Sequence, residues 1–132
     1  MPRLNISNYQ QLARKAKQEL ATDPRQAAEK AYLAAVHASR MILECSEMPS
    51  GRAGYRSSAA IGRASDILIQ KLGKADPQAN KLRTAFGNAL GAHTSCFYEG
   101  VCVPENIRKV VLGVVQATHT VENVCRRIKP SR

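Results

Sequence analysis

The sequence predicts an all-α protein, a single domain of four to five helices packed as an antiparallel bundle. Apolar residues recur at helical spacing along almost the whole chain, and no segment shows the alternation of apolar and polar residues that is typical of a half-buried strand. Asp-Pro pairs stand at Asp23-Pro24 and Asp76-Pro77. Asp caps the first turn of a helix and Pro fits its first position, so each pair marks a helix start. Short connections favour antiparallel neighbours.

Five helical segments are expected within one domain of residues 1–132. Their approximate ranges are 7–20, 24–47, 58–72, 77–97 and 104–128. The first is amphipathic, and the second is apolar around most of its circumference, which predicts a central position with several neighbours. The third and fourth each carry one apolar face. The fifth follows Pro104, and its valines and isoleucines recur at helical spacing, which outweighs the weak helix propensity of valine.

Composition and charge narrow the classes of function. The chain has 132 residues, 44% of them hydrophobic, which suits one globular domain. No apolar run reaches the ~20 residues that span a bilayer, and the N-terminus lacks the apolar core of an export signal. We therefore expect a cytoplasmic protein that does not enter a membrane. The 20 Lys and Arg against 10 Asp and Glu give a formal charge of +10, which favours an acidic partner, most often nucleic acid.

The four cysteines form neither a C-x-x-C pair nor a zinc-finger spacing. Cys96 and Cys102 bracket a short loop close to His93, which leaves a metal site conceivable. The favoured interpretation is that all four cysteines, including Cys45 and Cys125, are reduced thiols that pack as small apolar residues. We expect no cofactor and no metal.

Two stretches carry a resemblance to a known family. The stretch DPRQAAEKAYLAAVHASRMIL, residues 23–43, resembles the alanine-rich signature helix of HEPN domains. The stretch AHTSCFYEG, residues 92–100, with PENIRKVVLGVV after it, resembles the late segment of HEPN-like proteins that include the PaREP1-type group. The resemblance implies a helical bundle that commonly dimerises. It also implies a place in prokaryotic conflict or toxin–antitoxin systems, with an antitoxin or a nucleotidyltransferase-type protein as possible partner.

Active members of the resembled family are metal-independent RNases in which an arginine precedes a histidine by four to six intervening residues. This chain departs from that pattern, because nine residues separate Arg83 from His93. On one helix such a pair lies ~15 Å apart along the axis. Catalysis by His93 would need an arginine from elsewhere, for example Arg63. We commit to no catalytic residue, and His93, Arg83 and Arg63 remain candidates beside the simpler interpretation that His93 is a packing residue.

Basic residues supply candidates for contact with nucleic acid. Arg52 and Arg56 stand in the loop sequence MPSGRAGYRSS, and further candidates lie in the helices and at the C-terminal end. The remaining candidates are Arg63, Arg83, Arg126, Arg127 and Lys129. The last three also suit the negative end of the final helix, which is a structural reason for their presence. Gly87 and Gly91, four residues apart, predict the close approach of a neighbouring helix.

The sequence therefore favours a small basic protein that acts without catalysis, as an RNA-binding or assembly module, and that forms a homodimer. The first alternative is a metal-independent endoribonuclease toxin that uses His93. The second is a structural subunit that binds an acidic protein.

Overall fold

Helices make up the fold of this chain. The structure, a computed structural model, describes residues 6–46 and 57–128. Within these ranges no strand occurs, which confirms the predicted all-α class. The elements are α1 (Ile6–Glu19), α2 (Pro24–Cys45), α3 (Ser57–Leu72), α4 (Pro77–His93), a π-helical turn η1 (Thr94–Tyr98), α5 (Pro104–Thr118) and α6 (Val121–Ile128).

The two Asp-Pro pairs start helices as predicted. Asp23 accepts a hydrogen bond from the backbone N–H of Gln26 at 3.2 Å, and Asp76 accepts one from Ala79 at 3.0 Å. Each carboxylate thereby satisfies a backbone donor that has no partner within its helix. These caps fix the starts of α2 and α4, the two helices that carry Glu29 and His93, whose contact is described below.

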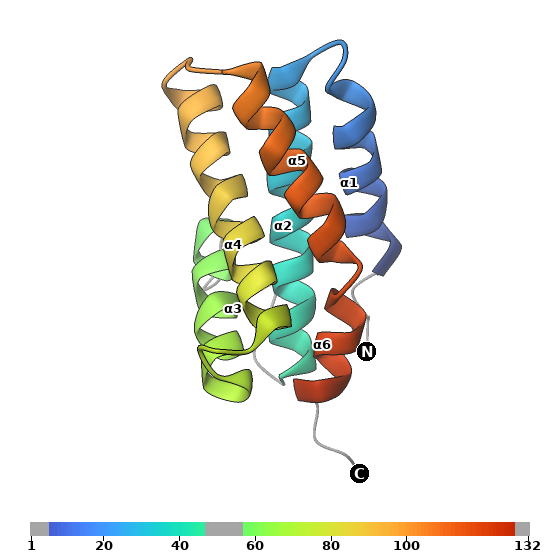
Figure 1. Ribbon diagram of the computed structural model, residues 1–132, viewed down its shortest axis with the longest axis vertical. Coiled ribbons are helices and arrows are strands. Elements are labelled where there is room, and N and C mark those ends of the chain that lie inside the picture. Colours follow the sequence, from blue (N-terminus) through green and yellow to red (C-terminus); the bar gives the residue numbers. More distant parts are fainter. Residues whose placement is uncertain (1–5, 47–56, 129–132) are drawn as a thin grey trace.

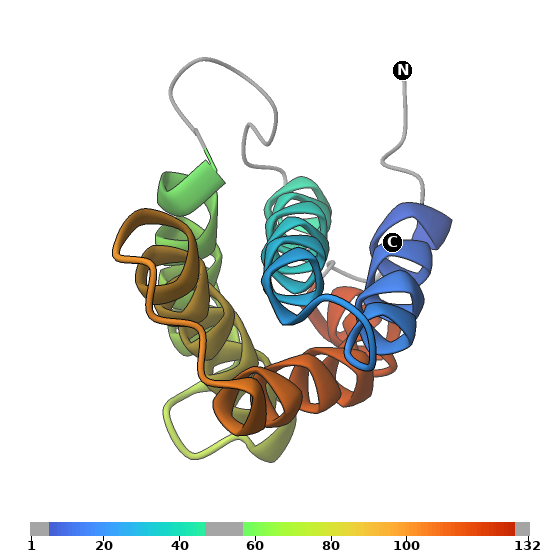
Figure 2. The same cartoon turned by 90° about the horizontal axis from the view of Figure 1, so that it is seen from above.

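Helix α2 stands in the middle of the molecule and touches every other helix. Figure 1 shows α2 running antiparallel to α1 and α4, and Figure 2 shows α1 on one side of α2, α3 and α4 on the other, and α5 across the remaining side. The buried residues of α2 include six alanines. Because alanine has almost no side chain, neighbouring helices can approach α2 closely from several directions.

The single helix expected over residues 104–128 is wrong, since the structure breaks it into α5 and α6 at His119. The hydroxyl of Thr118 donates to the carbonyl of Val115 at 2.7 Å, and that of Thr120 donates to the carbonyl of Ala117 at 2.8 Å. Threonine hydroxyls that bind backbone carbonyls in this way compete with the regular helix pattern. The break lets α6 fold across the far end of α2 instead of continuing along the axis of α5.

The described helices include none that is both long enough and apolar enough to cross a membrane.

Candidate functional site

His93 packs between two residues of α2. Its ring lies parallel to that of Tyr32, with centroids 3.8 Å apart and planes 7° from parallel. Its Nδ1 stands 2.9 Å from Oε1 of Glu29, and its side chain is only 12% exposed. The stack and the ion-pair contact join the C-terminal end of α4 to the N-terminal half of α2, which gives His93 a clear structural role.

The predicted arginine partners of His93 take other positions. Arg83 lies ten residues earlier on α4, so the two residues are separated by ~15 Å along the helix. Its guanidinium donates to the side chain of Asn80 at 3.1 Å. Arg63 is a half-buried residue of α3. Arg25, which was not singled out from the sequence, stands one turn before Glu29 on the same face of α2.

The guanidinium of Arg127 binds two side chains of α4 and its cap, those of Gln78 and Asp76. Its guanidinium makes a two-pronged contact with the carboxylate of Asp76, in which Nη1 lies 3.1 Å from Oδ2, and Nη1 also donates to Gln78 at 2.8 Å. The hydrogen bonds from Arg127 and from the backbone of Ala79 lower the pKa of Asp76 to about 2. Arg127 therefore ties the end of α6 to the cap of α4.

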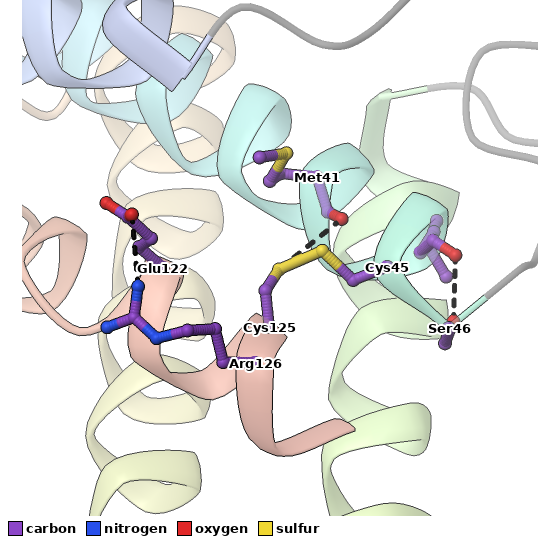
Figure 3. Close-up of a disulfide and its surroundings, with 7 residues drawn as sticks. Met41, Cys45, Ser46, Glu122, Cys125 and Arg126 are labelled. Atoms are coloured by element: carbon purple, nitrogen blue, oxygen red, sulfur yellow. Dashed lines mark hydrogen bonds and ion pairs between the residues drawn. A yellow bond between two sulfur atoms is a disulfide. The ribbon is translucent and has the colours of Figure 1, made fainter. Parts of the chain in front are cut away.

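Of the other basic candidates for nucleic-acid contact, Arg126 is paired with an acidic residue and three lie outside the described residues. Arg126 donates to Glu122 at 3.1 Å, one turn earlier on α6, and both side chains are exposed (Figure 3). An exposed pair of this kind contributes little to stability and can exchange its partner for a phosphate. Arg52, Arg56 and Lys129 lie outside the described residues.

The expectation of four reduced thiols is wrong, because the structure pairs all four cysteines. Cys45 at the end of α2 is bonded to Cys125 of α6, with Cα atoms 5.5 Å apart (Figure 3). Cys96 is bonded to Cys102, with Cα atoms 4.4 Å apart, and closes the loop between η1 and α5. Sulfur atoms engaged in disulfides are not available as thiolate ligands. In the described ranges no group of three or more His, Cys, Asp or Glu residues could hold a metal ion.

A groove between α1 and α5 brings together cations that are far apart in the sequence. Its volume is about 790 Å³. Lys17, Leu20 and Ala21 line it from the end of α1, and the first turns of α5 line it from the other side. The lining residues of α5 are Pro104, Glu105, Arg108, Lys109 and Leu112. We call this surface the cationic groove, because three cations face one carboxylate over a largely apolar floor.

The cations of the cationic groove have no acidic partner among the described residues, whereas Arg126 and Arg127 at the C-terminal end each have one. Lys17, Arg108 and Lys109 are exposed, and none forms an ion pair with another residue in the described part of the chain. By contrast, Lys30 of α2 pairs with Glu19 of α1 and links these two helices. The charges of the groove are therefore available to a ligand, and the positive end of the α5 dipole adds to them.

Sequence reasoning missed the cationic groove. Pro104, Arg108 and Leu112 recur at helical spacing, which places them on one face of α5, but nothing in the sequence indicates that Lys17 faces them from α1. The packing of α5 against α1, which brings residues about 90 positions apart together, creates the site.

Comparison with known proteins identifies one family. The model of the archaeal PaREP1/PaREP8 family matches residues 4–115. No curated protein and no solved structure matches the chain significantly. The match covers most of the chain, and the chain therefore belongs to the archaeal PaREP1/PaREP8 family.

Proposed function

We propose that this member of the archaeal PaREP1/PaREP8 family is a non-catalytic, RNA-associated module that holds the phosphate backbone of RNA in the cationic groove. One observation carries the proposal. Lys17, Arg108 and Lys109 converge on a groove of about 790 Å³ and have no carboxylate partner among the described residues. Cations that outnumber the carboxylates around them, as these three outnumber Glu105, attract phosphates, whose bound counterions are released on binding.

The lining of the groove favours contact with the backbone over reading of sequence. It holds no aromatic side chain on which a base could stack, and no asparagine or glutamine that could read a base edge. Leu20, Leu112 and Pro104 offer apolar surface beside the cations. We expect binding that tolerates many sequences and weakens steeply with salt.

We extend the proposal to the cellular system and the location in which the protein acts. The resemblance to HEPN domains supports an RNA-associated role in a prokaryotic toxin–antitoxin or defence system. We also propose a cytoplasmic location. Paired cysteines are compatible with it, because intracellular proteins can carry disulfides, as those of hyperthermophilic archaea do.

A second candidate function is metal-independent RNA cleavage by His93. The contact of 2.9 Å between Glu29 and Nδ1 of His93 favours it, because a carboxylate beside one ring nitrogen orients an imidazole for acid–base work at the other. Arg25, one turn before Glu29 on α2, is then a candidate to stabilise a phosphate. The burial of His93 and its stacking on Tyr32 weigh against this function.

A single experiment separates these functions. The purified protein is incubated in EDTA with labelled RNA of mixed sequence at low salt, and both cleavage and mobility shift are scored. We expect intact RNA that shifts equally with the wild type and with His93→Ala. Cleavage that disappears in His93→Ala would instead establish the nuclease. RNA that is neither cleaved nor shifted would contradict both, and would favour an acidic protein partner such as an antitoxin.

A further inference from the structure

The segment that leads into α5 is held to the core by one side chain. From Glu99 to Asn106 every residue is exposed except Cys102, which is partly buried against the core. Cys102 is bonded to Cys96 of η1, which is only 2% exposed. The next residue anchored in the core is Ile107, which is 3% exposed. The bond between Cys96 and Cys102 is therefore the covalent anchor of an otherwise exposed stretch of chain.

Backbone hydrogen bonds hold only the first part of this segment. The N–H of Glu99 donates to the carbonyl of Thr94 at 3.2 Å, and that of Val101 donates to the carbonyl of Ser95 at 2.8 Å. The N-cap residue of α5 is Val103, whose side chain offers no acceptor for the first N–H groups of the helix. The order of the first turn of α5 therefore depends on the disulfide that lies just before it.

The first turn of α5 forms part of the wall of the cationic groove. Pro104 and Glu105 line the groove from this turn, and Arg108 and Lys109 follow in the next one. The positive end of the α5 dipole lies at the same turn. If the turn loosens, the groove loses this wall, and the positive end of the dipole no longer faces a bound phosphate.

The two disulfides differ in how readily a reductant reaches them. Cys45 and Cys125 join the packed helices α2 and α6, and Sγ of Cys125 lies 3.7 Å from the carbonyl oxygen of Met41. Cys102 lies in the exposed segment, whose few buried contacts allow it to open locally with a small input of free energy. Accessible disulfides are the labile ones, so the bond between Cys96 and Cys102 should be reduced first.

We propose that the bond between Cys96 and Cys102 is a redox switch for the cationic groove. Its reduction loosens the start of α5 and thereby weakens the binding of RNA phosphates. This inference rests on the proposed function for its ligand. It also agrees with the proposed cytoplasmic location, because disulfides in that compartment are often transient and sense the redox state.

The chemistry of the switch is thiol–disulfide exchange with a dithiol, which supplies two electrons. One thiolate of the dithiol attacks Sγ of Cys102, and Cys96 leaves as a thiolate that takes up a proton. The second thiol of the dithiol, after losing its proton, attacks the mixed disulfide. Cys102 then leaves and is protonated, and the dithiol has become a disulfide. The same exchange in reverse restores the bond between Cys96 and Cys102.

The test uses the full chain with dithiothreitol as the dithiol. Alkylation with iodoacetamide and mass spectrometry identify the reduced cysteines at each concentration. Hydrogen exchange without RNA follows the backbone of residues 99–106, and fluorescence anisotropy with a short labelled single-stranded RNA gives the affinity. We expect Cys96 and Cys102 to be alkylated before the other pair. At that point exchange over 99–106 should be at least ~10-fold faster, and the RNA affinity should fall about fivefold.

Two variants assign the effect to one bond. Cys96→Ser/Cys102→Ser keeps the other disulfide, and it should show fast exchange and weak RNA binding both with and without dithiothreitol. Cys45→Ser/Cys125→Ser is the matched control, which should bind RNA as the wild type does and lose affinity about fivefold on reduction. Circular dichroism verifies that both variants fold. Wild type reduced only at Cys96 and Cys102 provides the same comparison without any substitution.

The outcomes separate this inference from the proposed function. Equal exchange over 99–106 in the oxidised and reduced proteins would overturn the switch. Faster exchange with an unchanged RNA affinity would overturn it as well, because the segment would then not control the groove. Reduction of the other disulfide first would contradict the assignment to Cys96 and Cys102. A protein that binds no RNA in either state, yet exchanges faster when reduced, would contradict the proposed function and support the loosening of α5.

Discussion

The imidazole of His93 lies flat on the ring of Tyr32, with 3.8 Å between the ring centroids, and thereby connects α4 to α2. The residue that most invites a catalytic interpretation in the sequence is thus a partly covered contact between two helices in the fold. His93→Ala should lower the free energy of unfolding by about 1–3 kcal/mol, because it removes a stacked pair and the partner of Glu29. Chemical denaturation followed by circular dichroism measures this loss.

A double-mutant cycle separates the two contacts of His93. Glu29→Gln removes the charge beside the imidazole and keeps the shape of the side chain. If the contact stabilises the fold, the effects of Glu29→Gln and His93→Ala are not additive. A His93→Ala variant as stable as the wild type would show that the stack contributes nothing.

Acid should weaken the contact between α6 and α4 through Asp76. Its pKa in the folded protein is about 2, below the usual value of 3.8, because Arg127 and the backbone of Ala79 donate to the carboxylate. A lowered pKa stabilises the fold above pH 3.8, and this contribution is lost as the pH falls from about 4 to 2. Between these values the wild type should lose more stability than Asp76→Asn, which keeps a capping side chain but does not titrate.

Thermal melts of both proteins between pH 5 and 2 measure this difference. Arg127→Gln serves as the control, since it removes the cation and leaves the carboxylate of Asp76 and its cap in place. Its melts should depend on pH less than those of the wild type and more than those of Asp76→Asn. Identical pH dependence in all three proteins would contradict the assignment.

The two disulfides should contribute unequally to stability. The bond between Cys45 and Cys125 closes a loop of 80 residues, whereas that between Cys96 and Cys102 closes one of six. Since the entropy removed from the unfolded chain grows with loop length, the first should stabilise by about 4 kcal/mol and the second by about 2 kcal/mol. Denaturation of the variants Cys45→Ser/Cys125→Ser and Cys96→Ser/Cys102→Ser gives the ranking, and the reverse order would contradict this account.

The helices were largely predictable because their signals are local. The caps at Asp23 and Asp76 need only a side chain and the next turn of backbone, and both pairs start helices in the structure. The break between α5 and α6 was missed, because Val121 and Val124 continue the apolar pattern of α5 and conceal the effect of Thr118 and Thr120.

Features that depend on contacts between distant segments were not predictable. The pairing of Cys45 with Cys125 requires α6 to lie against the end of α2, and α6 starts only after the break that follows α5. Likewise, the cluster of basic residues in the sequence suggests Arg127 as a contact for nucleic acid, while its carboxylate partner lies 51 residues earlier. The cationic groove depends on the packing of α1 against α5, which cannot be predicted from a single sequence.

The most direct test of RNA binding through the cationic groove is the salt dependence of the affinity, measured by fluorescence anisotropy with a short labelled single-stranded RNA. Lys17→Gln/Arg108→Gln/Lys109→Gln is compared with Lys15→Gln/Lys71→Gln/Lys74→Gln, which removes three exposed cations outside the groove. Three lost phosphate contacts should make the slope of log K against log salt shallower by about 2, and the control should keep the slope of the wild type. Equal slopes for both variants would contradict the assignment of the cationic groove as the RNA site.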